Sequence, residues 1–219
     1  MPHGKHTAAD YYPRRLYQRE IQNPYTVFHS FFDACPLPQA LGNIDGWLKA
    51  VTANNYWKKS YPANLLHFYE MMERLVEAAY LINKLDNRNA AAVLAETPEP
   101  EIDLMVPASY YGWQTKYSAW DYFPRSLNKK QFINPYIAFK KFFKYQDMPV
   151  WREVLYDLLY NAFVGKMELE LGEYDMLAVQ KHLKRLVEAA HLVEVRTRVR
   201  VKEKKEKVEL NDAEGKKED

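Results

Sequence analysis

The sequence predicts an all-α protein that contains two copies of a three-helix unit, and three observations support this fold class. The string RLVEAA occurs at 74–79 and again at 185–190, an offset of 111 residues. The same offset aligns DYYPR at 10–14 with DYFPR at 121–125, with no net insertion. Apolar residues recur at helical spacing through both candidate units. Glycine is scarce, with seven residues, which disfavours all-β folds rich in tight turns.

The offset divides the chain into four segments: a first repeat unit (1–83), a linker with an aromatic-rich end (84–120), a second repeat unit (121–194) and a charged tail (195–219). A three-helix unit of about 75 residues is small for a domain that folds alone. The tandem duplication therefore predicts that the two units pack together, either as one bundle with pseudo-two-fold symmetry or as a short solenoid.

The first helix of each unit is expected to open with Asn-Pro, at 23–24 and 134–135. Asparagine caps a helix N-terminus, and proline is tolerated at the first helical position because its missing N–H would be unpaired anyway. Beyond it, Tyr136, Phe139 and Phe143 recur at i, i+3 and i+7 and predict one buried stripe, with the neighbouring lysines facing water.

The second helix is expected to begin near Pro38 or Pro149, and Gly165 is its expected C-cap in the second unit. The first unit's version contains two glycines, each costing about 1 kcal/mol relative to alanine, and is predicted to be the weaker helix. The third helix contains RLVEAA. Its Leu-Val pair points inward, whereas Arg and Glu are expected to flank the packed seam.

The linker and the tail differ in composition from the repeat units. Turn-rich and proline-rich sequence predicts a linker around the apolar piece EIDLMV at 101–106. The strict alternation of RTRVRVK at 196–202 predicts a short strand, and a two-stranded β element with 101–106 is expected. The last dozen or so residues are charged and balanced in sign, and we expect them to be disordered.

Composition restricts the partners and the compartment. A net charge of +2 gives no overall field that would draw the chain to nucleic acid or anionic lipid. The single cysteine, Cys35, rules out an internal disulfide framework and a cysteine metal cluster. No apolar run reaches the roughly 18–20 residues of a membrane helix, and the N-terminus lacks a secretory signal. We expect a cytoplasmic protein without a cofactor or a membrane partner; a homodimer is compatible with the sequence.

Polar residues shared by both units are the best internal indication of function, and the favoured interpretation is structural, because a duplicated scaffold keeps what folding needs. The functional interpretation makes Arg14 and Arg125 two anion sites, one per unit, since a guanidinium binds carboxylate or phosphate as a rigid fork. The shared pairs are Asp10/Asp121, Arg14/Arg125, Asn23/Asn134, Arg74/Arg185 and Glu77/Glu188.

The preferred function is a non-enzymatic interaction module that binds a protein or small-molecule partner through an aromatic and arginine surface. Tyrosine and tryptophan combine large contact area with a hydrogen-bonding tip, and the segment 109–125 is rich in both. The residues expected at this surface are Arg14, Arg125, Tyr110, Tyr111, Trp113 and Trp120.

The alternative function depends on Arg185 and His191. Their spacing resembles the Arg-x(4–6)-His motif of HEPN-type helical ribonucleases, which implies an RNA-cleaving or RNA-binding protein. Six residues place the two side chains about 120° apart on one helix, and Tyr80 replaces the histidine in the first unit. Glu188 and His191 also form a Glu-x-x-His pair, but the first unit lacks its histidine, so no metal site is expected.

Overall fold

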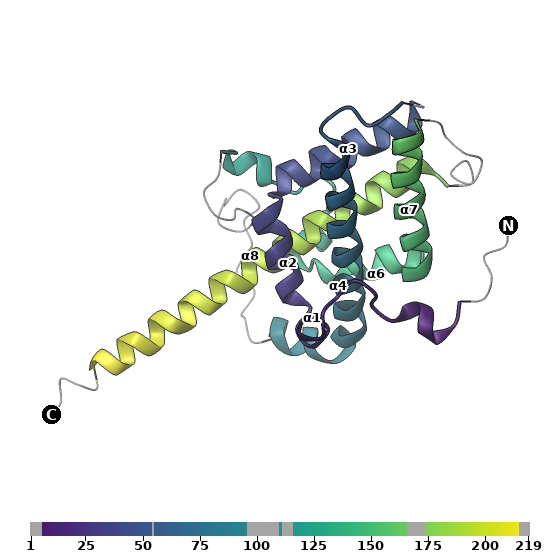
Figure 1. Cartoon of the computed structure of the whole chain (residues 1–219). Coiled ribbons are helices and arrows are strands. Elements are labelled where there is room, and N and C mark those ends of the chain that lie inside the picture. Colours follow the sequence, from purple (N-terminus) through teal and green to yellow (C-terminus); the bar gives the residue numbers. More distant parts are fainter. Residues whose placement is uncertain (1–5, 54, 96–109, 111–115, 166–173, 215–219) are drawn as a thin grey trace.

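A computed structural model of the chain describes residues 6–53, 55–95, 110, 116–165 and 174–214, although not the side chains of 86–95 and 198–214. All regular elements in this part of the chain are helices, so the predicted all-α helical bundle is confirmed (Figure 1). Within the described residues, no helix is long and apolar enough to cross a membrane.

The helices follow one another in the same order in the two halves of the chain. The first half contains η1 (Ala8–Tyr11), α1 (Gln18–Gln22), α2 (Tyr25–Ala34), α3 (Leu37–Thr52) and α4 (Pro62–Ala95). The second half contains η3 (Ala119–Tyr122), α5 (Lys129–Ile133), α6 (Tyr136–Tyr145), α7 (Met148–Val164) and α8 (Met176–Glu214). The elements η3, α5, α6 and α7 each begin 111 residues after η1, α1, α2 and α3.

The two long helices extend beyond the segment boundaries expected from the sequence. Helix α4 continues to Ala95, past the expected end at 83, and α8 continues to Glu214, into the tail expected to be disordered. The strand expected at 196–202 is therefore wrong, because these residues continue α8. Extending a formed helix needs no new nucleus, whereas an isolated two-stranded ribbon is only marginally stable. Its expected partner at 101–106 lies outside the described residues.

The two halves interlock. Helix α3 packs most extensively against α8, and α7 packs most extensively against α4 (Figure 1). Each of these two equivalent helices therefore contacts the long last helix of the other half. Within each half, α2 packs on α4 and α6 packs on α8. The connection between α3 and α4 also reaches the other half, because the Trp57 N–H donates to the Ala162 carbonyl oxygen at 2.9 Å.

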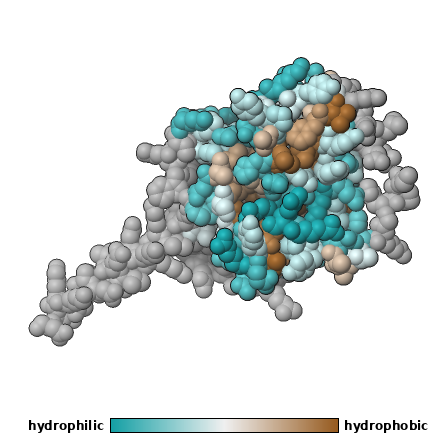
Figure 2. Space-filling view, in the orientation of Figure 1, coloured by the Kyte–Doolittle hydropathy of each residue, from teal (hydrophilic) through white to brown (hydrophobic). Residues whose placement is uncertain are grey.

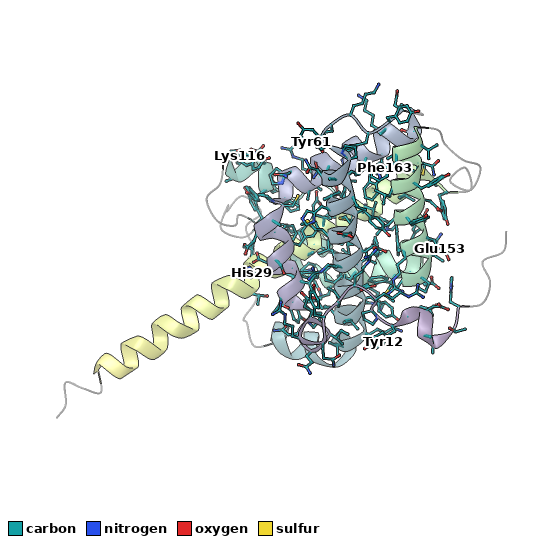
Figure 3. The ribbon with its side chains drawn as sticks, in the orientation of Figure 1. Tyr12, His29, Tyr61, Lys116, Glu153 and Phe163 are labelled. Carbon is teal, nitrogen blue, oxygen red and sulfur yellow. The ribbon has the colours of Figure 1, made fainter. Side chains whose placement is uncertain are left out.

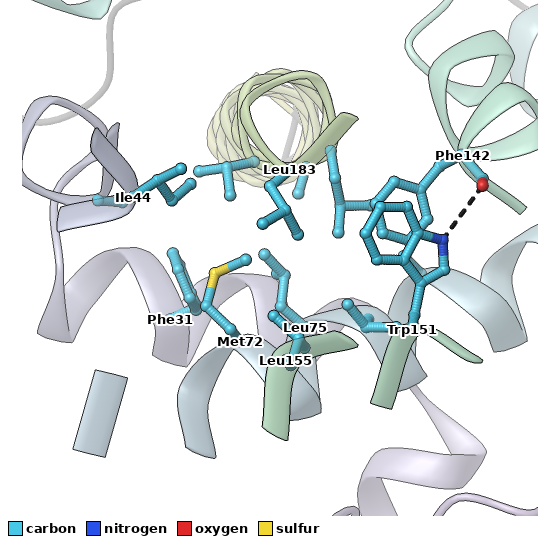
Figure 4. Packing of buried hydrophobic residues seen from close by; sticks show 14 of the residues in the cluster. Phe31, Ile44, Met72, Leu75, Phe142, Trp151, Leu155 and Leu183 are labelled. Atoms are coloured by element: carbon cyan, nitrogen blue, oxygen red, sulfur yellow. Dashed lines mark hydrogen bonds between the residues drawn. The ribbon is translucent and has the colours of Figure 1, made fainter. Parts of the chain in front are cut away.

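Aromatic pairs at the 111-residue offset meet between α2 and α6. The Phe28 and Phe139 rings lie 5.8 Å apart between centroids, and the Tyr25 and Tyr136 hydroxyl oxygens are 3.5 Å apart. Around them a single apolar cluster draws on both halves (Figure 4). In this cluster the Trp151 Nε1–H donates to the Phe142 carbonyl oxygen at 3.2 Å. The labelled members are Phe31, Ile44, Met72, Leu75, Phe142, Trp151, Leu155 and Leu183.

Local signals account for the helix ends. The Asn134 side chain accepts a hydrogen bond from the Tyr136 N–H at 3.1 Å, although Pro135 is the residue that directly precedes α6 and Asn134 ends α5. Gly165 ends α7 in the left-handed region at φ +68°, as the sequence predicts, where a side chain would be strained. Helix α3 nevertheless spans 16 residues despite its two glycines. A Cβ atom at Gly46 would lie 3.0 Å from the Lys59 side chain and 3.3 Å from the Trp57 ring, so this glycine makes room for the following connection.

Candidate functional site

The aspartates shared by both halves organise their own turns. Asp10 Oδ2 accepts hydrogen bonds from the N–H and the hydroxyl of Thr7, at 2.8 and 2.9 Å. Asp121 Oδ2 accepts the corresponding bonds from Ser118 at the same two distances. The backbone bond is the largest cause that lowers the pKa of each carboxyl group. Each aspartate therefore caps its own 3-10 turn.

Glu77 and Glu188 are fully buried, whereas the sequence placed them beside the packed seam; that placement is wrong. Glu77 accepts hydrogen bonds from the backbone N–H groups of Arg14 and Arg15, at 2.9 and 2.8 Å. Glu188 accepts them from the corresponding loop, including the Ser126 N–H at 2.9 Å. Each carboxylate thus connects the loop after a 3-10 turn to the long last helix of its own half, α4 for Glu77 and α8 for Glu188. A buried carboxylate is stable only when such donors replace its water.

Arg152 neutralises Glu77 and was missed by the sequence analysis. Its Nε donates to Glu77 Oε1 at 3.0 Å, and its Nη2 lies 2.5 Å from the same oxygen. The guanidinium also donates to the carbonyl oxygens of Asp10 and Tyr12, at 2.6 and 2.8 Å. Arg152 lies on α7 of the other half, and the residue 111 positions earlier is Leu41, so the repeat offered no signal for this ion pair.

Glu188 has no equivalent cation among the residues that the structure describes. Its carboxylate accepts hydrogen bonds from the backbone N–H groups of Arg125, Ser126 and Leu127, at 2.9 to 3.2 Å, and from the Ser126 side chain. Burial raises the pKa of Glu188 to about 7, and the hydrogen bonds from Ser126, Arg125 and Leu127 only partly oppose that rise. Two carboxylates at matching positions therefore differ in charge compensation.

The structure does not bring Arg14 and Arg125 together. Both side chains are exposed, but η1 packs against α7 whereas η3 packs against α3. The Arg14 Nη2 lies 3.0 Å from Asp10 Oδ1. The two arginines therefore follow turns that pack on different helices.

The expected aromatic surface is only partly exposed. Tyr110 is fully buried, and its ring lies against Phe123 and Trp120, at centroid distances of 5.1 and 6.5 Å. Trp120 is 51% exposed and covers this cluster from outside. Tyr110 therefore packs rather than presenting a binding surface, and Tyr111 and Trp113 lie outside the described residues.

Arg185 and His191 do not share an exposed cleft. The Arg185 Nε donates to the Ser126 carbonyl oxygen at 2.9 Å. His191 is buried between Tyr122, with ring centroids 5.5 Å apart, and Phe32, at 4.9 Å. Arg185 therefore binds the loop after η3 within the second half, whereas His191 packs between η3 and α2 of the first half.

The outward side of α7 carries an exposed apolar stripe that the sequence analysis missed. Tyr156, Tyr160, Phe163 and Val164 are 56%, 42%, 38% and 38% exposed and recur at i, i+4, i+7 and i+8. We call these four residues the aromatic face. Figure 2 shows apolar side chains at the upper right of the molecule, where Figure 3 labels Phe163. The stripe was missed because α7 is apolar on its inner side as well, so its pattern lacks a polar face.

The corresponding side of α3 is polar or small. The residues 111 positions before the aromatic face are Asp45, Lys49, Thr52 and Ala53. Asp45 pairs with Lys184 of α8 at 2.6 Å. No known protein family, curated protein or solved structure matches this chain. The internal comparison between the halves therefore carries the functional argument.

Proposed function

We propose that this chain is a non-enzymatic binding module that docks a partner protein on the aromatic face of α7. The partner presents apolar side chains to Phe163 and Val164 and hydrogen-bonding groups to the tyrosine hydroxyls. Exposed tyrosines and phenylalanines at helical spacing are typical of protein interfaces, because each brings large contact area at little entropy cost.

The observation that carries this proposal is the difference between α7 and α3. We infer that the halves arose by tandem duplication, which the equal offsets of η3, α5, α6 and α7 support. On that basis the fold itself does not require apolar residues at these four positions, since α3 has Asp45, Lys49, Thr52 and Ala53 there. Apolar surface that the scaffold does not need indicates a binding role.

The shape of the surface favours a protein over a small ligand. The aromatic face lies along the outside of one helix, whereas small-molecule sites are concave and bury most of their ligand. A reducing, cytoplasmic setting remains part of the proposal. Burial raises the pKa of the single thiol, Cys35, to about 11, so this thiol is unreactive near neutral pH.

Site-specific photocrosslinking tests the proposal with a matched control. Phe163 on the aromatic face and Thr52 at the corresponding α3 position are each replaced by p-benzoyl-phenylalanine, and the full chain is irradiated in an extract of its source cells. We expect a discrete heterologous adduct from position 163 and none from position 52. Tyr160→Lys, which copies Lys49 of α3, should abolish the adduct.

The control is the free energy of unfolding of Tyr160→Lys, measured beside the parent, so that loss of the adduct is read only from a folded variant. Equal adducts from both positions, or an adduct that survives Tyr160→Lys, would contradict the proposal. An adduct between two copies of the chain would show that the partner is a second copy of this protein rather than a different protein.

A further inference from the structure

Helix α8 continues well beyond the bundle. Val195 is still buried against the other helices, and the Arg196 Nη1 donates to the Ile133 carbonyl oxygen at 3.1 Å. From there the helix runs on to Glu214, and Figure 1 shows this end pointing away from the other helices. We call residues 198–207 the projecting segment.

The projecting segment concentrates positive charge. Six of its ten residues are lysine or arginine and two are glutamate, a net charge of +4, so the rest of the chain has a net charge of −2. The overall charge of +2 therefore averages regions of opposite sign. The positions 111 residues earlier, 87–96, contain one cation and one anion, and α4 nevertheless continues to Ala95. Extending the helix therefore does not require these cations.

The six cations form two rows on opposite sides of the helix. Both rows have the spacing i, i+4, i+7, and the second row is offset from the first by two residues. At about 100° per residue, this offset places the two rows about 160° apart. The first row consists of Arg198, Lys202 and Lys205, and the second of Arg200, Lys204 and Lys207.

The two sides of the helix between these rows differ in polarity. Val201 and Val208 lie on one side. Val199, Glu203 and Glu206 lie on the other. The helix thus has an apolar side with a row of cations on each flank, and its carboxylates are on the far side. This arrangement matches the major groove of B-form DNA, which admits one α-helix and has a phosphate backbone along each edge.

Other phosphate surfaces match this arrangement less well. A helix that lies on a lipid surface needs large apolar residues along one side and cations along the other. In the projecting segment the cations lie on both flanks and the residues between them are valines. Duplex RNA has a major groove that is too deep and narrow for a helix to enter.

We propose that the projecting segment of α8 binds double-stranded DNA in the major groove, with one row of cations along each phosphate backbone. The side of Val201 and Val208 lies toward the floor of the groove. Phosphate contacts carry no sequence information, so binding is expected to depend little on base sequence. This function goes beyond the partner docking proposed for α7 and uses a different part of the molecule.

The salt dependence of binding tests the proposal directly. Fluorescence anisotropy of a labelled mixed-sequence DNA duplex of about 24 base pairs measures the affinity of the full chain between about 50 and 200 mM KCl. Six cations on phosphates predict a slope of about −5 for log K against log salt, which is roughly a thousandfold loss of affinity over this range. A slope weaker than about −2 would overturn the proposal.

Charge removal at two places assigns the binding to the projecting segment. Replacing the three cations of either row with glutamine should reduce the magnitude of the slope by about 3. The matched control replaces Lys140, Lys141 and Lys144, three exposed lysines of α6, and should leave the slope unchanged. An equal change in the control would mean that overall charge binds the DNA. An effect from one row alone would contradict the groove arrangement.

A pair of single substitutions tests which side of the helix lies in the groove. Val201→Glu and Val199→Glu add the same charge two residues apart. Val201→Glu puts a carboxylate between the two rows and should weaken binding by about tenfold or more, because it faces phosphates. Val199→Glu joins the carboxylates on the far side and should weaken binding by less than about threefold. Equal losses would contradict the proposal.

Duplex RNA of the same sequence and vesicles of phosphatidylserine and phosphatidylcholine distinguish DNA from other phosphate surfaces. The RNA duplex should bind at least about tenfold more weakly than DNA, because its major groove does not admit the helix. Vesicle binding as tight as DNA binding, or equal affinities for the two duplexes, would overturn the proposal.

Discussion

Glu77 and Glu188 occupy matching positions in the two halves. Comparing them distinguishes the hydrogen bonds that both halves share from the ion pair that is present in one half. Both carboxylates bind the backbone N–H groups of the loop that follows a 3-10 turn. Within the described residues, Glu77 pairs with a guanidinium and Glu188 does not. The amide contacts are therefore sufficient to position the loop, and Arg152 determines how well that half tolerates the buried charge.

The outward sides of α3 and α7 give a second comparison of the same kind. The two helices have equivalent neighbours, since α3 packs on α8 and α7 packs on α4. Their inner sides are apolar alike, whereas only α7 exposes Tyr156, Tyr160 and Phe163. Packing therefore explains the inner residues of both helices but does not require the apolar outer residues of α7.

The largest effect is expected from removing the cation of the first half. Arg152→Leu leaves Glu77 buried beside an apolar group and also removes the bonds to the Asp10 and Tyr12 carbonyl oxygens. Breaking a buried ion pair by removing one partner costs about 3–5 kcal/mol. Urea unfolding at neutral pH measures this loss of unfolding free energy.

A second substitution separates charge from packing at this site. Glu77→Gln in the Arg152→Leu background should recover part of the lost stability, because the neutral amide no longer needs a counter-charge. If Arg152→Leu alone changes the free energy of unfolding by less than about 1 kcal/mol, the two halves do not differ in the way proposed here.

The sequence predicted the local structure well because helix patterns are local. The Gly165 C-cap and the apolar stripes of α4 and α8 follow from neighbours within a few residues, and each is present. The all-α class follows from the same periodicity. The strand at 196–202 was wrong because alternation over seven residues also fits a helix that has already begun at Met176.

The long-range arrangement was not predictable from one sequence. Nothing in the spacing shows that α3 would pack on α8 rather than on α4, because both long helices present an apolar face. The pairing of Arg152 with Glu77 joins residues 75 positions apart and has no counterpart in the repeat. The burial of Tyr110 likewise depends on Trp120 and Phe123 folding over it.

The free energy of unfolding, measured at several pH values, tests how the two carboxylates differ. Because the pKa of Glu188 is raised from 4.5 to about 7 in the folded protein, its contribution to stability is present below pH 4.5 and declines as pH rises through 7. The full decline corresponds to about 3 kcal/mol. Glu188→Gln should therefore gain stability relative to the parent as pH rises, measured by urea unfolding from pH 4 to 9. A constant difference between the two proteins would contradict the assignment.

The smallest effect concerns the two glycines that distinguish α3 from α7. Gly42→Ala should stabilise the protein by about 0.5–1 kcal/mol, because alanine favours the helix and the new Cβ meets only the far end of the exposed Lys59 side chain, 3.2 Å away. Gly46→Ala gains the same propensity but presses on the buried Trp57 ring, so its net gain should be near zero. Thermal unfolding of the two variants compares them directly. If Gly46→Ala were the more stabilising substitution, the contact with Trp57 would not be the reason for glycine at that position. The two glycines would then lower the stability of α3 through helix propensity alone.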